Sequence, residues 1–108
     1  NPVIINREVE AYSDKFGFAC RVDFICELQK QVWLLDFKTN DKCQIYNEVG
    51  LQLKAGQIAI GESSNVKIER TGAVALSITG EFAFKETKDT KEDLQALLDL
   101  WKWIQRKE

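Results

Sequence analysis

The most regular pattern in the chain is an alternation of apolar and polar positions over residues 18–28. One face of this segment would carry Phe18, Cys20, Val22, Phe24, Cys26 and Leu28. The opposite face would carry Ala19, Arg21, Asp23, Ile25 and Glu27. A period of two predicts a β-strand with one apolar face.

Two neighbouring segments extend this strand into a three-stranded unit. Residues 3–12 have a β-rich composition, and residues 32–38 are apolar on both faces, which predicts a central strand. The turn-like sequence of residues 13–17 and the polar residues 27–31 separate the three strands. We therefore expect two consecutive β-hairpins.

A helix is predicted next, over residues 43–60. One stripe of this helix would carry Tyr46, Val49, Leu53 and Ile60, and the neighbouring stripe would carry Ile45, Glu48, Gln52 and Ala59. Gly50 and Gly56 each cost a helix about 1 kcal/mol, so we interpret them as positions of close packing. Residues 61–65 read as a loop, and residues 66–78 and 81–86 as two further strands.

The last segment predicts an amphipathic helix. Thr90 and Asp93 form the pattern of a capping box, with Glu92 beside them at the positive end of the helix dipole. The stripe expected to be buried is Leu94, Leu97, Leu98, Trp101 and Ile104. Trp103 lies off this stripe, where it could pack against a partner chain or stack on a base. The order βββ-α-ββ-α predicts an α/β or α+β fold in one domain, residues 1–108, with a central mixed sheet of about five strands flanked by helices.

Composition narrows the chemistry that is available. The chain is 44% apolar and 30% charged, as in a globular domain, and it contains no histidine. Ser-His-Asp and Cys-His catalysis and the usual zinc sites are therefore excluded. Phosphate-binding glycine motifs are also absent. Carboxylates, lysines and oxygen-binding cations remain, and a net charge of −2 gives no general attraction for nucleic acid.

The cysteines and the hydropathy predict the redox compartment of the protein and whether it associates with a membrane. Cys20, Cys26 and Cys43 form no CxxC pair, which favours free thiols in a reducing, cytoplasmic compartment and small buried side chains. No apolar run reaches the roughly 18 residues that a membrane span needs. We therefore expect no membrane association.

The predicted hairpins bring acidic residues together. A turn centred between Gln29 and Lys30 would place Asp23 opposite Asp36, on one face, with Cβ atoms about 5 Å apart. A first turn centred between Lys15 and Phe16 would place Glu8 opposite Asp23. Three carboxylates would then cluster across three strands, and Lys38 shares the face of Asp36.

Two interpretations of this cluster remain open. Asp36 and Lys38 could belong to an exposed cross-strand charge pattern with Arg21 and Glu27. Alternatively, the adjacent carboxylates, which repel one another and raise each other's pKa, could be the ligands of a divalent cation. The coincidence of two registers, three acids and a lysine favours the cation site.

These residues also resemble a known family. The segment GFACRVDFICELQKQVWLLDFKTN contains a small residue, Asp23, a hairpin, and an apolar strand that ends in Asp36-x-Lys38-Thr39. The following IYNEVGLQLKAG carries Gln52 in a helix. In this order, over roughly residues 6–60, the chain resembles the PD-(D/E)XK nuclease superfamily, and within it the RecB-like and phage-type exonuclease branch.

The resemblance implies a restriction-endonuclease-like core and metal-dependent hydrolysis of single- or double-stranded DNA. Asp23 and Asp36 would ligate Mg²⁺ or Mn²⁺, with the carbonyl of Phe37 and, less closely matched, Glu8. Lys38 would orient the attacking water, help to deprotonate it, or stabilise charge on the phosphate. Gln52 would hold the site or contact substrate. Substrate contacts would further include Thr39 and Lys54.

Some positions depart from the family pattern. Val22 replaces the name-giving proline, Cys20 stands where this branch often has glycine, and Gly56 stands where an aromatic residue often follows the glutamine. The family's N-terminal helix has no counterpart, so a fragment, a minimal enzyme and an inactive domain all remain open. The alternative function is a non-catalytic nucleic-acid-binding or assembly module that retains the nuclease fold. Partners could include a second copy or other domains of a parent protein.

Overall fold

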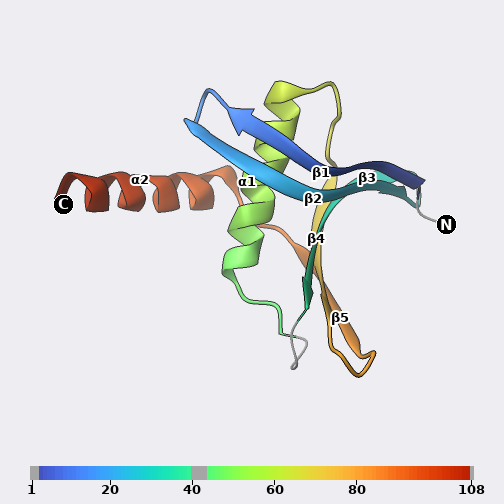
Figure 1. The fold of residues 1–108 in the computed structure, drawn as a ribbon. Helices are drawn as coiled ribbons and strands as arrows, with labels where there is room; N and C mark the ends of the chain where they lie inside the picture. The colour runs from blue at the N-terminus through green and yellow to red at the C-terminus, as the bar shows by residue number, and fades with distance from the viewer. Residues whose placement is uncertain (1–2, 40–43, 108) are drawn as a thin grey trace.

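The computed structural model describes residues 3–39 and 44–107. It has the predicted order βββ-α-ββ-α and an α+β architecture (Figure 1). The elements are β1 (Val3–Ser13), β2 (Phe18–Leu28), β3 (Gln31–Thr39), α1 (Glu48–Ser63), β4 (Arg70–Leu76), β5 (Phe82–Thr87) and α2 (Lys91–Lys107).

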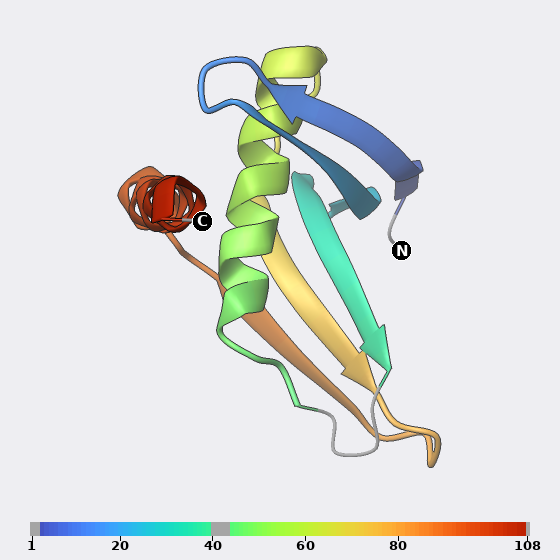
Figure 2. The same ribbon diagram turned by 60° about the vertical axis from the view of Figure 1, so that its left-hand side comes forward.

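The five strands form one mixed sheet in the order β1-β2-β3-β4-β5. All neighbouring pairs are antiparallel except β3 and β4, which are parallel and are joined through α1. Helix α1 crosses one face of the sheet, while β1 and β2 turn away from the direction of β3, β4 and β5 (Figure 2). The predicted mixed sheet of five strands is confirmed.

The predicted register is confirmed for the second hairpin and, from Asn6 to Ser13, for the first, where the pairing of Val3 and Ile4 is shifted by one residue. In the second hairpin Ile25 pairs with Leu34, so paired residue numbers sum to 59. In the first hairpin Val9 pairs with Val22, which gives the predicted sum of 31. The turn between β2 and β3 consists of Gln29 and Lys30, with φ of 54° and 65°. Two consecutive positive φ values are typical of the type I′ turn, whose twist suits a two-residue hairpin.

Helix α1 packs tightly on the centre of the sheet. A Cβ at Gly56 would lie 2.8 Å from both Leu34 Cδ2 and Val22 Cγ1. A Cβ at Gly50 would overlap the carboxylate of Asp89. The interpretation of both glycines as positions of close packing is therefore confirmed. The buried residues of the helix are Val49, Gly50, Leu53, Gly56, Ala59 and Ile60.

The predicted bounds of this helix were wrong at both ends. The helix begins at Glu48 rather than at residue 43, and residues 44–47 are irregular apart from a turn at Asn47. The expected loop at 61–65 is helical up to Ser63, whose hydroxyl donates a hydrogen bond to the Ala59 carbonyl. A serine hydroxyl bonded in this way to the carbonyl four residues earlier is compatible with a helix, although it slightly destabilises and often bends it. Cys43 lies outside the described residues.

The expected strict alternation in β2 breaks at Asp23. Val22 lies in the core beneath α1, and the next core residue of this strand is Ile25 rather than Phe24. The ring of Phe24 instead packs edge-on against Phe37, with centroids 5.4 Å apart. Across the strand pair from Asp23, Glu8 has a φ of 51°, and the pairs on either side of it, Arg7–Phe24 and Val9–Val22, keep one register. The break in the alternation of β2 therefore coincides with the positive φ at Glu8, whereas the register shift of this strand pair lies farther along β1, between Ile4 and Asn6.

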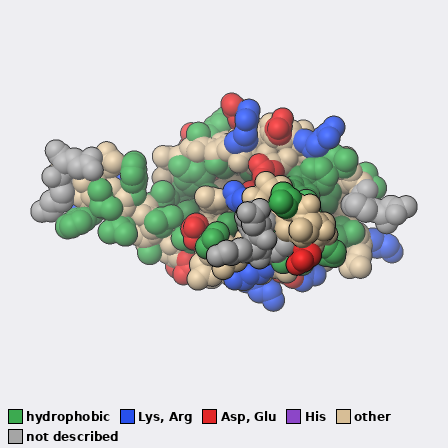
Figure 3. Space-filling view, turned by 60° about the horizontal axis from the view of Figure 1, so that its bottom comes forward, with side chains coloured by type: hydrophobic (Ala, Val, Ile, Leu, Met, Phe, Trp, Pro, Cys, Tyr) green, Lys and Arg blue, Asp and Glu red, His purple; other side chains and the backbone are tan. Residues whose placement is uncertain are grey.

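Helix α2 has the predicted start but not the predicted packing. The backbone N–H of Asp93 donates to Thr90 Oγ1 at 3.1 Å, and that of Thr90 donates to Asp93 Oδ2 at 2.9 Å, which confirms the capping box. Of the expected buried stripe only Leu94 is buried, whereas Trp101 is 58% exposed. The helix projects beyond the sheet, and hydrophobic side chains lie along it in Figure 3. The prediction that the whole stripe enters the core was wrong.

Within the described residues, neither helix is long and apolar enough to cross a membrane.

Candidate functional site

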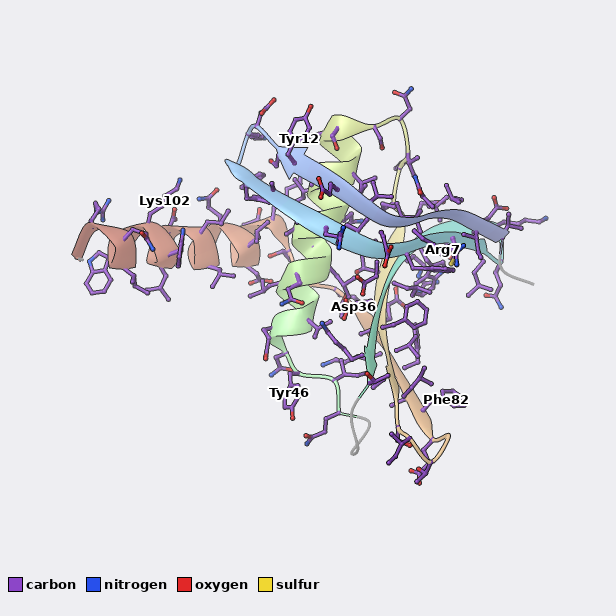
Figure 4. The ribbon with its side chains drawn as sticks, in the orientation of Figure 1. Arg7, Tyr12, Asp36, Tyr46, Phe82 and Lys102 are labelled. Atoms are coloured by element: carbon purple, nitrogen blue, oxygen red, sulfur yellow. The ribbon has the colours of Figure 1, made fainter. Side chains whose placement is uncertain are left out.

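The candidate site lies where β2 and β3 separate. Their hydrogen-bonded pairing ends at Phe24 and Leu35, and the next positions on the two strands are Asp23 and Asp36. Both aspartates line one cleft, and Asp36 lies between β3 and α1 (Figure 4). The backbone N–H of Phe37 donates to Asp23 Oδ2 at 3.4 Å, a side-chain oxygen of β2, beyond the end of the backbone pairing between the two strands. The two aspartates therefore share a face, as the register predicts.

Lys38 joins the carboxylate pair. Its Nζ lies 3.4 Å from Asp36 Oδ2, while the side chains of Lys38 and Asp36 are 43% and 16% exposed. Asp36 Oδ2 is itself buried and accepts no hydrogen bond of good geometry. A buried carboxylate oxygen that lacks a hydrogen-bond donor is costly, and such groups often mark functional positions.

The surroundings of Asp36 favour its neutral form. Burial, together with a hydrogen bond and charge repulsion from Asp23, raises the pKa of Asp36 to about 6, although the Lys38 ammonium opposes this shift. Burial is the largest of these causes because it removes water from the charged carboxylate. A carboxylic acid that titrates this close to neutrality is a candidate for proton transfer or cation binding.

The cleft beside the two aspartates has a volume of about 390 Å³. It lies between β2, β3 and the two helices, and its polar side chains include Gln52 from α1 and Arg21 from β2. Its walls are mostly apolar, with Leu97 and Leu98 contributed by α2. The leucines that the sequence assigned to the core thus form one wall of the cleft.

The other expected site residues are more scattered. Glu8 is exposed and lines a separate shallow hollow with Arg7, Asp23 and Phe37. Within residues 3–39 and 44–107 no group of three acidic, cysteine or histidine side chains is placed to hold a metal ion. The structure therefore brings together two carboxylates of the expected three.

The three residues expected to contact substrate lie in different parts of the structure. Gln52 is exposed and lines the cleft, whereas Thr39 is exposed at the end of β3 and is not among the residues that line the cleft. The ammonium of Lys54 donates to Gln57 Oε1 at 2.9 Å and lines other hollows on α1. Lys54 is therefore not part of the same site in this structure.

Sequence reasoning missed the contribution of Arg21 and Glu48 to the cleft. Both are exposed residues that line it. The alternation of β2 did assign Arg21 to the face opposite the apolar side chains. The signal that could have indicated Glu48 is its spacing of four residues from Gln52, which places both side chains on one side of a helix.

Comparisons with known proteins add the fold but no family. No protein-family model and no curated protein matches the chain. Among solved structures, it is similar to the crystal structure of SSO0001, with a TM-score of 0.53 and 15% sequence identity. The match covers 92% of this chain and 46% of that one, so the chain spans less than half the length of its structural neighbour. At this identity the likeness indicates a shared fold alone.

Proposed function

We propose that this chain is a metal-dependent nuclease that hydrolyses phosphodiester bonds of DNA. The observation that carries the proposal is that Asp23 and Asp36 lie next to each other where β2 and β3 separate, with Lys38 Nζ 3.4 Å from Asp36. The resemblance of Asp23, Asp36-x-Lys38 and Gln52 to the PD-(D/E)XK pattern supports it. An exonuclease, rather than an endonuclease, is the form that the resembled branch favours.

The residues present suit a hard divalent cation. Asp23 and Asp36 offer carboxylate oxygens, the ligands that Mg²⁺ and Mn²⁺ prefer, and buried Oδ2 of Asp36 makes an ion pair with Lys38 but accepts no hydrogen bond of good geometry. The carbonyl of Phe37 would be a further ligand. Glu8 lies in the neighbouring hollow and is not needed for this donor set. When bound, the cation would lower the pKa of a water molecule and offset negative charge on the phosphate.

Side chains of the protein would position the substrate and stabilise the charge that develops during hydrolysis. Lys38 would place its ammonium beside the phosphate oxygens, where negative charge develops, or hold the attacking water in position. Gln52 would donate from its amide to the substrate at the mouth of the cleft. Asp36, with its pKa raised to about 6, is mostly ionised at pH 7 and available as a ligand.

A reducing intracellular compartment belongs to the same proposal. Cys20 and Cys26 are free thiols, and burial raises the pKa of both. Protonated thiols are poor nucleophiles and poor metal ligands. These cysteines are therefore better suited to packing than to chemistry.

The test is hydrolysis of end-labelled single- and double-stranded DNA by the purified chain with Mg²⁺ or Mn²⁺, with and without chelator. We expect cleavage that requires metal and is lost in Asp36→Asn. Asp99→Asn is the matched control, because Asp99 is an exposed residue on α2 outside the cleft. Cleavage that survives chelation, or that Asp36→Asn leaves intact, would refute the assignment.

A non-catalytic module with the same fold is the second candidate. The observation in its favour is that, in the described part of the chain, no three acidic or cysteine side chains are placed to hold a metal ion, where a fuller ligand set was expected. Such a module would bind DNA or a partner without metal-dependent cleavage. Absence of hydrolysis by the parent chain, together with no effect of metal on its melting temperature, would favour this candidate.

A further inference from the structure

The cleft beside Asp23 and Asp36 combines acidic side chains with a mostly apolar lining. Asp23 and Asp36 contribute carboxylates, whereas much of the remaining lining is apolar, including Phe18, Leu51, Leu97 and Leu98. These apolar residues come from β2, α1 and α2, so three elements enclose the same space. Its volume of about 390 Å³ is sufficient for a planar heteroaromatic group with an attached sugar.

The charge of the lining indicates which part of a nucleic acid would enter. Among the described residues of the cleft, Arg21 is the one cation, while Asp23, Asp36 and Glu48 are acidic. A run of phosphates along these walls would lose its hydration and would meet more negative charge than positive charge. A nucleobase is uncharged and has apolar faces, so it can replace water on such walls at much lower cost.

We propose that this cleft holds a nucleobase of single-stranded nucleic acid, splayed from its neighbours, next to the phosphodiester bond at Asp23 and Asp36. The inference rests on the proposed function. A base in a duplex is paired and stacked, and taking it out of the helix costs free energy that a single strand does not require. The cleft therefore selects a single strand or an unpaired end as the substrate.

Helix α2 is the element that creates this selectivity. Leu94, Leu97 and Leu98 of this helix line the cleft, and Leu94 is itself buried. Leu100, on the same helix, is 53% exposed and does not line the cleft. The helix thus offers both a test position and a matched control within four residues.

The primary test measures binding without metal, so that its result does not depend on catalysis. Fluorescence anisotropy in chelator would compare a labelled 12-residue oligothymidylate with a strand of the same length made of abasic residues. We expect the strand with bases to bind about tenfold more tightly, the usual scale for a base held against a side-chain surface. Equal affinity for the two strands would overturn the proposal.

The variants locate the base. Leu97→Gln should weaken oligothymidylate binding by about fivefold or more, whereas Leu100→Gln should stay within about twofold of the parent. Both carry the same change on one helix, and Leu97 is already 43% exposed, so melting curves should confirm that each folds. Should Leu97→Gln fail to fold, Leu98→Gln serves in its place. A loss that is equal in the Leu97 and Leu100 variants would assign the binding to another surface and overturn the proposal.

Assays of DNA hydrolysis distinguish failure of this inference from failure of the proposed function. Metal-dependent cleavage of a single strand that is much faster than cleavage of a blunt duplex supports both. Equal cleavage of the two substrates, with no effect of Leu97→Gln, retains the nuclease and overturns the nucleobase cleft. Base-dependent binding without any hydrolysis supports the cleft and removes the nuclease.

Discussion

The ammonium of Lys38 lies 3.4 Å from Oδ2 of Asp36, at the point where β3 leaves its pairing with β2. Lys38 opposes the rise in the pKa of Asp36 that burial and Asp23 produce. The lysine therefore limits the rise in the pKa of Asp36, while its own side chain remains partly exposed. Its contribution to packing is small because its side chain is 43% exposed.

Replacing Lys38 should reduce hydrolysis strongly and change the melting temperature little. Lys38→Ala should melt within a few degrees of the parent, because a partly exposed ion pair contributes little to stability. It should lose hydrolysis by about a hundredfold or more, as expected on removing a positioned charge-stabilising group. The measurement pairs thermal melting with Mn²⁺-dependent cleavage of labelled DNA. Lys85→Ala, on the exposed surface of β5, is the control, and cleavage by Lys38→Ala within a few-fold of the parent would remove Lys38 from the mechanism.

The raised pKa of Asp36 makes stability depend on pH in a specific direction. Because the folded-state pKa is about 6 and the ordinary value is 3.8, the folded chain holds this proton more tightly than the unfolded chain. The contribution of Asp36 to stability is therefore most favourable below about pH 4 and is lost as the pH rises through 6. Asp36→Asn should raise the metal-free melting temperature by a few degrees at pH 8 and by much less at pH 4.

Melting curves of the parent and of Asp36→Asn at both pH values, in chelator, would measure this difference. Added Mg²⁺ or Mn²⁺ should raise the melting temperature of the parent at pH 8, because a ligand that binds only the folded state stabilises it. The variant should lose this response. A full metal response in Asp36→Asn would place the cation elsewhere.

Two glycines of α1 should respond in opposite directions to the same substitution. Gly56→Ala would put a Cβ 2.8 Å from Leu34 and Val22, so we expect a loss of about 1–3 kcal/mol from overpacking. A Cβ at Gly61 meets no atom within 4 Å, so Gly61→Ala should gain about 0.5–1 kcal/mol from helix propensity. Urea unfolding of the two variants measures both. Equal effects would mean that α1 is not seated on Leu34 and Val22 as described.

The tryptophans report on the placement of α2. Trp33 is 8% exposed, whereas Trp101 and Trp103 are 58% and 49% exposed. The parent's fluorescence should therefore be partly quenched by acrylamide, and Trp101→Phe with Trp103→Phe should leave a blue-shifted emission that acrylamide quenches poorly. Strong protection of all three tryptophans in the parent would show that α2 is covered in solution.

The hairpin registers could be predicted from sequence because the turns determine them. Once two residues, Gln29 and Lys30, form the turn, every pair of the ladder follows up to Phe24 and Leu35, and the next residues on the two strands are Asp23 and Asp36. The irregularity opposite Asp23 could not be predicted in this way. It depends on a positive φ at Glu8, a conformation that is uncommon for a residue other than glycine and has no signal in the apolar pattern.

The position of α2 shows a different limit. The spacing of Leu94, Leu97 and Trp101 correctly predicts a helix with one apolar face, but it does not say whether anything packs against that face. Leu94 is buried, and the residues beyond it are progressively farther from α1 as the helix projects (Figure 1). Periodicity reports the amphipathic character of a helix, and tertiary contacts decide its burial. For this reason Leu97 and Leu98, which the sequence pattern assigned to the core, line the cleft instead.

The position of Asp23 and Asp36 within one hairpin, joined by a two-residue turn, has a consequence for folding kinetics. The two carboxylates meet as soon as this hairpin closes, an event on the microsecond scale for isolated hairpins and one that requires little loop-closure entropy. If the hairpin belongs to the folding nucleus, their repulsion is already present in the transition state. Asp36→Asn should then accelerate refolding at pH 8 and also slow unfolding, giving an intermediate φ-value in stopped-flow measurements, because the burial of Asp36, the largest cause of its raised pKa, is completed only after the hairpin has closed. A variant that only slows unfolding would show that the two carboxylates come together late, when α1 docks on the sheet.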